Sequence, residues 1–181
     1  EVAASRVELD QLVRRLRDAG AAVQVAMTAG AQRFVTALSF QGLSGHPART
    51  SLWDESAEAA MGHIELARWA DEVLIAPASA DLLARIAHGH ADDLLSTLVL
   101  ATTAPVSVAP AMNQQMWANP ATQANIAQLR ERQVRVFGPA VGNQACGETG
   151  GGRLPEAQVL VAALVAARGP RPFDGLRVLV S

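Results

Sequence analysis

Hydrophobic positions along this chain alternate between helical spacing and short apolar runs. Over 7–18, leucines and valines fall on one side of a predicted helix, with three arginines turned away from it. The next segments predict a strand over 23–27, a helix over 30–38 and a loop over 41–47. The first quarter of the chain therefore indicates a helix, a strand and a second helix.

The rest of the chain repeats helix and strand. Two apolar runs, 72–77 and 105–110, are typical of strands that are buried on both faces. The other predicted elements are helices over 56–71, 81–101 (with a break near 88–90), 120–132 and 155–168, and a strand over 134–137. Such alternation predicts an α/β, Rossmann-like fold of three layers, in which helices flank a central parallel sheet.

Ligands of such sheets bind at the carboxyl ends of the strands, where three unusual segments are expected. The first, Pro-Ala-Ser-Ala-Asp over 77–81, enters a predicted helix, so Ser79 either caps that helix or helps to bind an anion there. The second, over 110–117, holds Asn113, whose amide can donate to a carboxylate or accept from a ring N–H. Its Met112, Met116 and Trp117 either wall a flat aromatic cofactor or pack in the core.

The third segment, over 139–156, contains five glycines and the single cysteine, Cys146. Glycines allow a loop to approach a ligand closely, so the thiol is either a reactive group on a mobile loop or an incidental part of a turn. One cysteine excludes a disulfide framework within the chain and fits a reducing compartment.

The histidines favour proton transfer over metal binding. His63 could take up a proton at neutral pH, although a solvated or core histidine is the commoner case. His88 and His90 flank a glycine without a ligand set at metal spacing, so no metal site is predicted. Asp92 and Asp93 form either an acid pair or a helix cap.

The amino-acid composition further narrows the possible classes of protein. Of 181 residues, half are hydrophobic and 18% are charged, which suits one compact domain. A net charge of −2 provides no general basic field that would attract nucleic acid. The apolar stretches are too short to span a membrane. The first residues lack signal-peptide character, and the first is not Met, so the chain is expected to be a fragment or a processed protein. Phosphate-loop, dinucleotide-fingerprint and serine-hydrolase motifs are missing.

Taken in order, five motifs resemble the flavin-containing cysteine decarboxylases, specifically the phosphopantothenoylcysteine decarboxylase domain of bifunctional bacterial coenzyme A biosynthesis proteins. The motifs are His-Ile-Glu-Leu-Ala-Arg-Trp-Ala-Asp (63–71), Pro-Ala-Ser-Ala-Asp (77–81), Ala-Asp-Asp-Leu (91–94), Pro-Ala-Met-Asn-Gln-Gln-Met-Trp (110–117) and Ala-Cys-Gly-Glu-Thr-Gly-Gly-Gly-Arg-Leu-Pro-Glu (145–156). The likeness covers about residues 7–168.

The resemblance implies an FMN cofactor and a set of site residues. The residues that it implies for the cofactor are Val2, Ala3, Thr28, Ala29, Gly30, Ser79, Ala80, Asp81 and Ala111. Those that it implies for the substrate are Asn113, Met116, Ala145, Cys146, Gly147 and Arg153. His63 is the implied base, Asn113 the carboxylate ligand, and Cys146 the acid on a loop that closes over the substrate.

The implied reaction converts 4′-phospho-N-pantothenoyl-L-cysteine to 4′-phosphopantetheine. Oxidation of the thiol creates an electron sink, CO₂ leaves, and the enethiolate is then reduced. The alternatives are a peptide-cysteine decarboxylase, a flavin prenyltransferase, or a flavin-binding regulatory oligomer without catalysis. The resemblance also implies a cytoplasmic, trimer-based homo-oligomer, expected to be a dodecamer, with FMN at subunit contacts.

Two domains are expected. Residues 1–168 form the decarboxylase domain, and 169–181 form a linker and the first strand of a truncated synthetase domain. Relatives begin with a strand and a glycine-rich turn, whereas here the strand is absent and residues 1–6 stand at the turn. As an alternative, the tail strand over 176–180 fills the missing sheet position, either within one chain or between chains.

Overall fold

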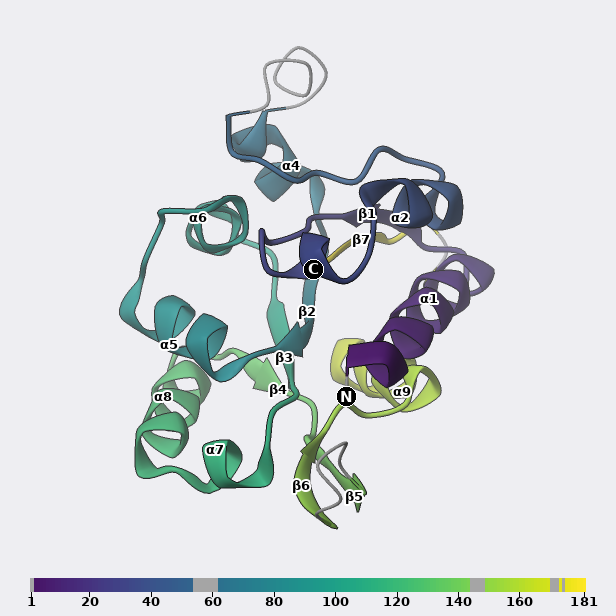
Figure 1. Cartoon of the computed structure of the whole chain (residues 1–181). Helices are drawn as coiled ribbons and strands as arrows, with labels where there is room; N and C mark the ends of the chain where they lie inside the picture. The colour runs from purple at the N-terminus through teal and green to yellow at the C-terminus, as the bar shows by residue number, and fades with distance from the viewer. Residues whose placement is uncertain (1, 54–61, 144–148, 170–172, 174) are drawn as a thin grey trace.

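The computed structural model describes residues 2–53, 62–143, 149–169, 173 and 175–181. A parallel sheet in the order β1-β7-β2-β3-β4 forms the middle layer (Figure 1). Its strands are β1 (Ala22–Val25), β2 (Glu72–Ala78), β3 (Val106–Pro110), β4 (Arg135–Val136) and β7 (Arg177–Val180). The predicted α/β class with a central parallel sheet is confirmed.

Helices cover both faces of this sheet (Figure 1). One face carries α1 (Val2–Asp18), α2 (Ala37–Ser44) and α9 (Ala157–Arg168). The other carries α4 (His63–Trp69), α5 (Ala80–His88), α6 (Leu94–Ala101) and α8 (Pro120–Glu131). The result is the three-layer arrangement that the sequence predicts.

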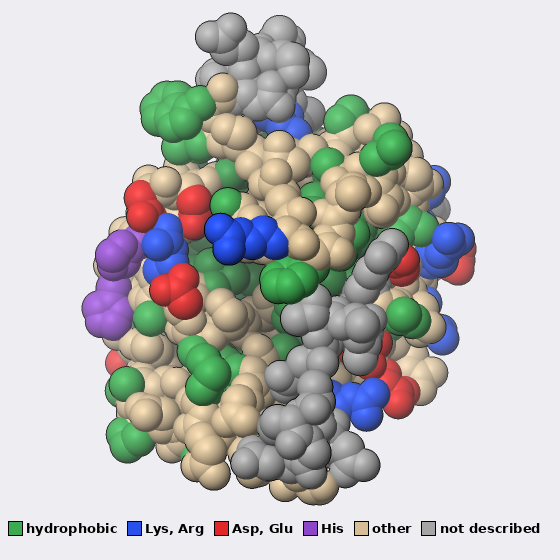
Figure 2. Space-filling view, viewed as in Figure 1, with side chains coloured by type: hydrophobic (Ala, Val, Ile, Leu, Met, Phe, Trp, Pro, Cys, Tyr) green, Lys and Arg blue, Asp and Glu red, His purple; other side chains and the backbone are tan. Residues whose placement is uncertain are grey.

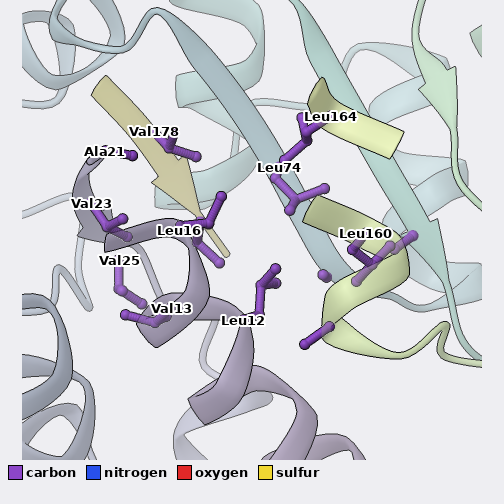
Figure 3. Close-up of a cluster of buried hydrophobic side chains, with 14 of the residues drawn as sticks. Leu12, Val13, Leu16, Ala21, Val23, Val25, Leu74, Leu160, Leu164 and Val178 are labelled. Atoms are coloured by element: carbon purple, nitrogen blue, oxygen red, sulfur yellow. The ribbon is translucent and has the colours of Figure 1, made fainter. Parts of the chain in front are cut away.

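The alternation of side chains along β2 explains the two cores. Leu74 packs with the cluster of α1 and α9, where Figure 3 shows Leu12, Leu16 and Leu160 around it. The neighbouring Ile75 packs with the cluster on the opposite face. Since both residues are fully buried, β2 lies in the interior of the sheet, as its continuous apolar run predicts.

Several predicted helix ends are confirmed by their capping geometry. Gly89 takes a left-handed conformation (φ 71°) and separates α5 from α6, which is the break predicted near 88–90. Asp93 then begins α6 in a reciprocal capping box with Ser96. Pro120 occupies the first turn of α8, where its missing N–H has no cost.

The predictions for 30–38 and 41–47 are wrong in detail. A short 3₁₀ helix, η1 (Ala31–Arg33), comes first, and α2 begins separately at Ala37. Thr36 sets this start because its hydroxyl accepts a hydrogen bond from the Ser39 N–H. Gly45, at φ 78°, ends the helix beyond the predicted start of the loop. Of the helix predicted over 56–71, residues 54–61 lie outside the described residues.

The glycine-rich segment and the tail both form strands. Strands β5 (Ala140–Asn143) and β6 (Thr149–Arg153) pair antiparallel as a hairpin where a loop was predicted. The tail strand β7 lies between β1 and β2 and pairs in parallel with both. The structure therefore places the tail in the sheet position that the alternative interpretation gave it.

Candidate functional site

A pocket of about 680 Å³ opens at the carboxyl ends of β1, β7 and β2. Its lining combines apolar side chains from α1, η1 and α2 with hydroxyl and charged groups from Thr28, Ser79, Asp81 and Arg85. Figure 2 shows acidic and basic side chains gathered on the α5 side of this face of the molecule. The pocket lies at the edge of the sheet where the sequence predicts a ligand site.

The segment after β1 forms one wall of the pocket. Thr28, Ala29 and Gly30 all line it, as the resemblance implies. The Thr28 hydroxyl accepts a hydrogen bond from the Ala31 N–H at 3.1 Å, which holds this turn at the start of η1. The bond uses only the acceptor capacity of the hydroxyl, so its proton can still be donated to a ligand.

The start of α5 forms a second wall. Ser79 caps this helix by accepting a hydrogen bond from the Leu82 N–H at 3.2 Å, and it also lines the pocket. The cap interpretation and the ligand interpretation of Ser79 are therefore compatible. Asp81 and Ala111 line the pocket as well, whereas Ala80 is not among the lining residues.

Arg85, which is not among the predicted site residues, adds a cation to the lining of the pocket. Its Nη2 pairs with Asp93 at 2.9 Å and with Asp92. The hydrogen bond from Arg85 lowers the pKa of the Asp92 carboxyl, and the same bond raises the pKa of Arg85. Arg85 lies four positions after Asp81, a predicted site residue, and this helical spacing is the only sequence signal that bears on it.

The second and third predicted segments meet beside this pocket. Met112, after β3, donates its N–H to the carbonyl of Gly152 in β6 at 2.8 Å. The short helix α7 (Gln114–Ala118) packs on β6, so that Gly150 lies against Gln114 and Gly151 against Trp117. A Cβ at residue 150 would overlap the end of the Gln114 side chain, so Gln114 would have to move to admit a side chain there.

Asn113 and Met116 lie at this second region and are not among the pocket-lining residues. The Oδ1 of Asn113 accepts a hydrogen bond from the Gln115 N–H at 2.8 Å, so Asn113 caps α7. Met116 is 49% exposed. Arg153, at the end of β6, is also absent from the pocket lining and pairs with Glu8 of α1 at 3.3 Å.

The other predicted site residues are distributed differently. His63 begins α4, and its buried Nδ1 has no hydrogen-bond partner among the described residues. It is not among the residues that line the pocket. Val2 and Ala3 belong to the first turn of α1, where the resemblance suggested a glycine-rich turn. Ala145, Cys146 and Gly147 lie outside the described residues, in the segment flanked by β5 and β6.

Two general properties of the described part of the chain bear on the site. Within it, no group of three or more His, Cys, Asp or Glu residues could hold a metal ion. Among the same residues, no helix is long and apolar enough to cross a membrane.

Comparisons with known proteins identify the family. The flavoprotein family model matches residues 2–169. The coenzyme A biosynthesis bifunctional protein CoaBC of Vibrio vulnificus (strain YJ016) is 55% identical over 170 residues, which cover 94% of this chain and 42% of the relative. The chain thus spans about two fifths of the length of this relative.

Two solved structures are similar over most of the chain. One is a PPC decarboxylase mutant complexed with pantothenoylaminoethenethiol, with 31% identity, a TM-score of 0.72 and coverage of 91% of both chains. The other is the FMN-dependent cysteine decarboxylase TvaF from thioviridamide biosynthesis, with 32% identity and a TM-score of 0.66. That match covers 77% of this chain and 85% of the other.

Proposed function

The chain belongs to the flavoprotein family, and from this premise we propose that it binds FMN and decarboxylates 4′-phospho-N-pantothenoyl-L-cysteine to 4′-phosphopantetheine in coenzyme A biosynthesis. The observation that carries the proposal is the pocket at the carboxyl ends of the strands together with the packing of β6 on α7. The first offers a cofactor site, and the second brings two of the predicted substrate segments together.

The pocket suits FMN in size and chemistry. A volume of about 680 Å³ lies within the usual range for cofactor sites, and the lining is mostly apolar, as a flat isoalloxazine ring requires. The hydroxyls of Thr28 and Ser79 supply donors for the polar part of the cofactor. In the proposal Ala29, Gly30, Ala80, Asp81 and Ala111 complete this site. When bound, FMN would supply the hydride chemistry that the protein's own side chains lack.

The side chains of the chain then bind the substrate and transfer protons. Asn113, whose Oδ1 accepts a hydrogen bond from the Gln115 N–H, is the residue that binds the substrate carboxylate in this proposal. His63 is the base that takes the thiol proton, and an unpartnered buried Nδ1 is consistent with a group that requires a ligand. Cys146 returns a proton after CO₂ is lost.

The remaining substrate contacts come from the hairpin and from α7. Ala145, Cys146 and Gly147 would close over the substrate, with Met116 and Arg153 at its edges. The anchoring of β6 by Met112 and by the Glu8–Arg153 ion pair supports this role, since both hold the strand that follows the cysteine segment. Such closure would exclude water from the reacting groups.

Assembly is part of the proposal. His63 does not line the pocket of its own chain, so a homo-oligomer is proposed to bring the His63 of one subunit to the pocket of another. We expect a trimer-based assembly, in the form of a dodecamer. We also propose that a synthetase domain, beginning with 169–181, follows the decarboxylase domain in a longer protein. A cytoplasmic location completes the proposal.

A peptide-cysteine decarboxylase is the second candidate, because TvaF, at 32% identity, is as similar in sequence to this chain as the PPC decarboxylase mutant, at 31%. The test is a substrate panel with FMN-loaded protein. Release of CO₂ from 4′-phospho-N-pantothenoyl-L-cysteine, with none from peptides that end in cysteine, supports the proposal. The reverse preference would select the peptide enzyme, and no release from either substrate despite FMN binding would favour a regulatory flavoprotein.

A further inference from the structure

Phe34 is an exposed aromatic side chain on the rim of the pocket. It lines the pocket and is 57% exposed, whereas its neighbour Val35 is buried. Phe40 also lines the pocket, but it is buried in the core on the α1 face of the sheet. Among the described residues, Phe34 is therefore the pocket-lining aromatic ring that a ligand can reach.

Backbone hydrogen bonds fix the position of Phe34 relative to the Thr28 wall of the pocket. At the end of η1, the N–H groups of Phe34 and Val35 donate to the carbonyl of Ala31 at 3.0 Å and 3.1 Å. The Ala31 N–H in turn donates to the hydroxyl of Thr28. The backbone at Phe34 is thus held between a pocket residue and a buried side chain, so a ligand needs to order little more than the ring.

The part of the lining near Phe34 in the chain is apolar. Val35 and Phe40 belong to one hydrophobic cluster, against which Leu9 of α1 packs, and all three line the pocket. The charged lining residues come instead from α5 and from the residue that caps α6. A flat apolar ring therefore finds its most favourable surroundings on the side of Phe34, because burial there costs no polar group its hydration.

We propose that the phenyl ring of Phe34 stacks on the isoalloxazine ring of FMN and shields it from solvent. Offset contact between two flat aromatic rings buries apolar area on both and adds electrostatic attraction. The inference rests on the proposed function, since it requires that the pocket binds FMN. It extends that function by assigning a contact with the flavin ring to a residue outside the set that the resemblance implies.

The test is titration of the flavin-free protein with FMN, followed by the change in flavin fluorescence. Loss of the ring contact should weaken FMN binding by Phe34→Ala about tenfold. Riboflavin, which lacks the phosphate, should show the same loss, because the contact lies at the ring. Leu38→Ala is the matched control, since Leu38 is 74% exposed in α2 and is absent from the pocket lining. Its affinity for both flavins should equal that of the wild type.

Tryptophan at the same two positions reports on the ring contact itself. An indole that touches an isoalloxazine ring quenches flavin emission by electron transfer, which a phenyl ring does not do. The emission lifetime of FMN bound to Phe34→Trp should therefore be shorter than in the wild type. FMN bound to Leu38→Trp should keep the wild-type lifetime.

The outcomes separate this inference from the function on which it rests. If the wild type does not bind FMN, both are overturned. If the wild type binds FMN and Phe34→Ala binds it equally well, only the inference is overturned. A loss seen with FMN and not with riboflavin would place the effect at the phosphate and overturn the stacking. A change in oligomeric state with unaltered flavin affinity would assign Phe34 to a subunit contact, which also overturns it.

Discussion

Arg177, the first residue of β7, forms a bidentate ion pair with the carboxylate of Asp71 through two side-chain nitrogens. Nη2 donates to Oδ1 at 2.7 Å and Nε donates to Oδ2 at 3.0 Å, while the Arg177 N–H also donates to Oδ2. Asp71 immediately precedes β2, so this pair fixes the start of the tail strand against its neighbour. Backbone hydrogen bonds hold both ends of β7, and the ion pair adds a side-chain contact at its start.

The first prediction concerns this pair and pH. Hydrogen bonding from Arg177 lowers the pKa of Asp71 below its ordinary value of 3.8, so folding stabilises the charged carboxylate. Asp71→Asn should lower the urea midpoint slightly at neutral pH, and the difference from the wild type should vanish as the pH falls below 3.8 through the lowered pKa. Parallel urea titrations across this range check it, and a difference that grows in acid would contradict it.

The second prediction concerns the contact between β6 and α7. Gly150→Ala places a methyl group against Gln114, whose side-chain end must move away while its Cβ lies close at 3.2 Å, so the fold should lose about 1 kcal/mol. Gly142→Ala is the matched control on the other strand of the hairpin. Its added carbon would meet the Arg153 side chain at an ordinary 3.5 Å. Urea unfolding of both variants is the measurement, and equal effects would contradict this account of Gly150.

Much of the fold follows from local sequence signals. The continuous apolar runs of β2 and β3, the Gly89 break and the proline at the start of α8 each report a local requirement of the backbone, and each prediction was confirmed. The boundary between η1 and α2 was missed because it depends on a single hydroxyl cap at Thr36. Helical spacing alone does not reveal such a cap.

The site could be predicted only in part. Thr28, Ser79 and Asp81 lie together because each follows or begins an element at the same edge of the sheet, which the order of elements makes predictable. Arg85 and Phe34 were missed since their places at the pocket depend on tertiary structure. Arg85 reaches the pocket from the second turn of α5, and Phe34 does so from the end of η1. The roles of His63, Asn113 and Cys146 stay predictions.

The third prediction concerns a buried charge at the start of β2, at the end of the sheet away from the pocket. Glu72 is fully buried at the start of β2, paired with Arg135 and lying 3.9 Å from Arg168. Burial lowers the pKa of Arg135, and the charge of Arg168 adds to this effect. Glu72→Ala would leave these cations without their counter-charge and should cost about 3–5 kcal/mol of stability.

Denaturant unfolding of Glu72→Ala and Glu72→Gln separates charge from volume at this position. Glu72→Gln keeps the volume and some hydrogen-bonding capacity, so we expect a smaller loss than for Glu72→Ala. If Glu72→Ala were as stable as the wild type, the three side chains would not form a stabilising cluster.

The fourth prediction concerns the proposed base. Removal of a general base should lower the rate of CO₂ release by His63→Asn by about 10²–10⁴-fold. His88→Asn is the control, because His88 is exposed and its Nδ1 contacts the Ala84 carbonyl in α5. Single-turnover assays with FMN-loaded proteins measure both variants. Unchanged turnover by His63→Asn would assign the base to another residue.

The proposed function requires decarboxylation without net oxidation, so that FMN would return to its starting oxidation state after each turnover. The most direct measurement is an anaerobic incubation of the FMN-loaded protein with 4′-phospho-N-pantothenoyl-L-cysteine, with no added oxidant or reductant. The account predicts multiple turnovers that release CO₂ and 4′-phosphopantetheine in a 1:1 ratio, identified by mass spectrometry, as the stoichiometry of simple decarboxylation requires. Bound flavin with no CO₂, or CO₂ release that stops after one equivalent of FMN is reduced, would contradict it.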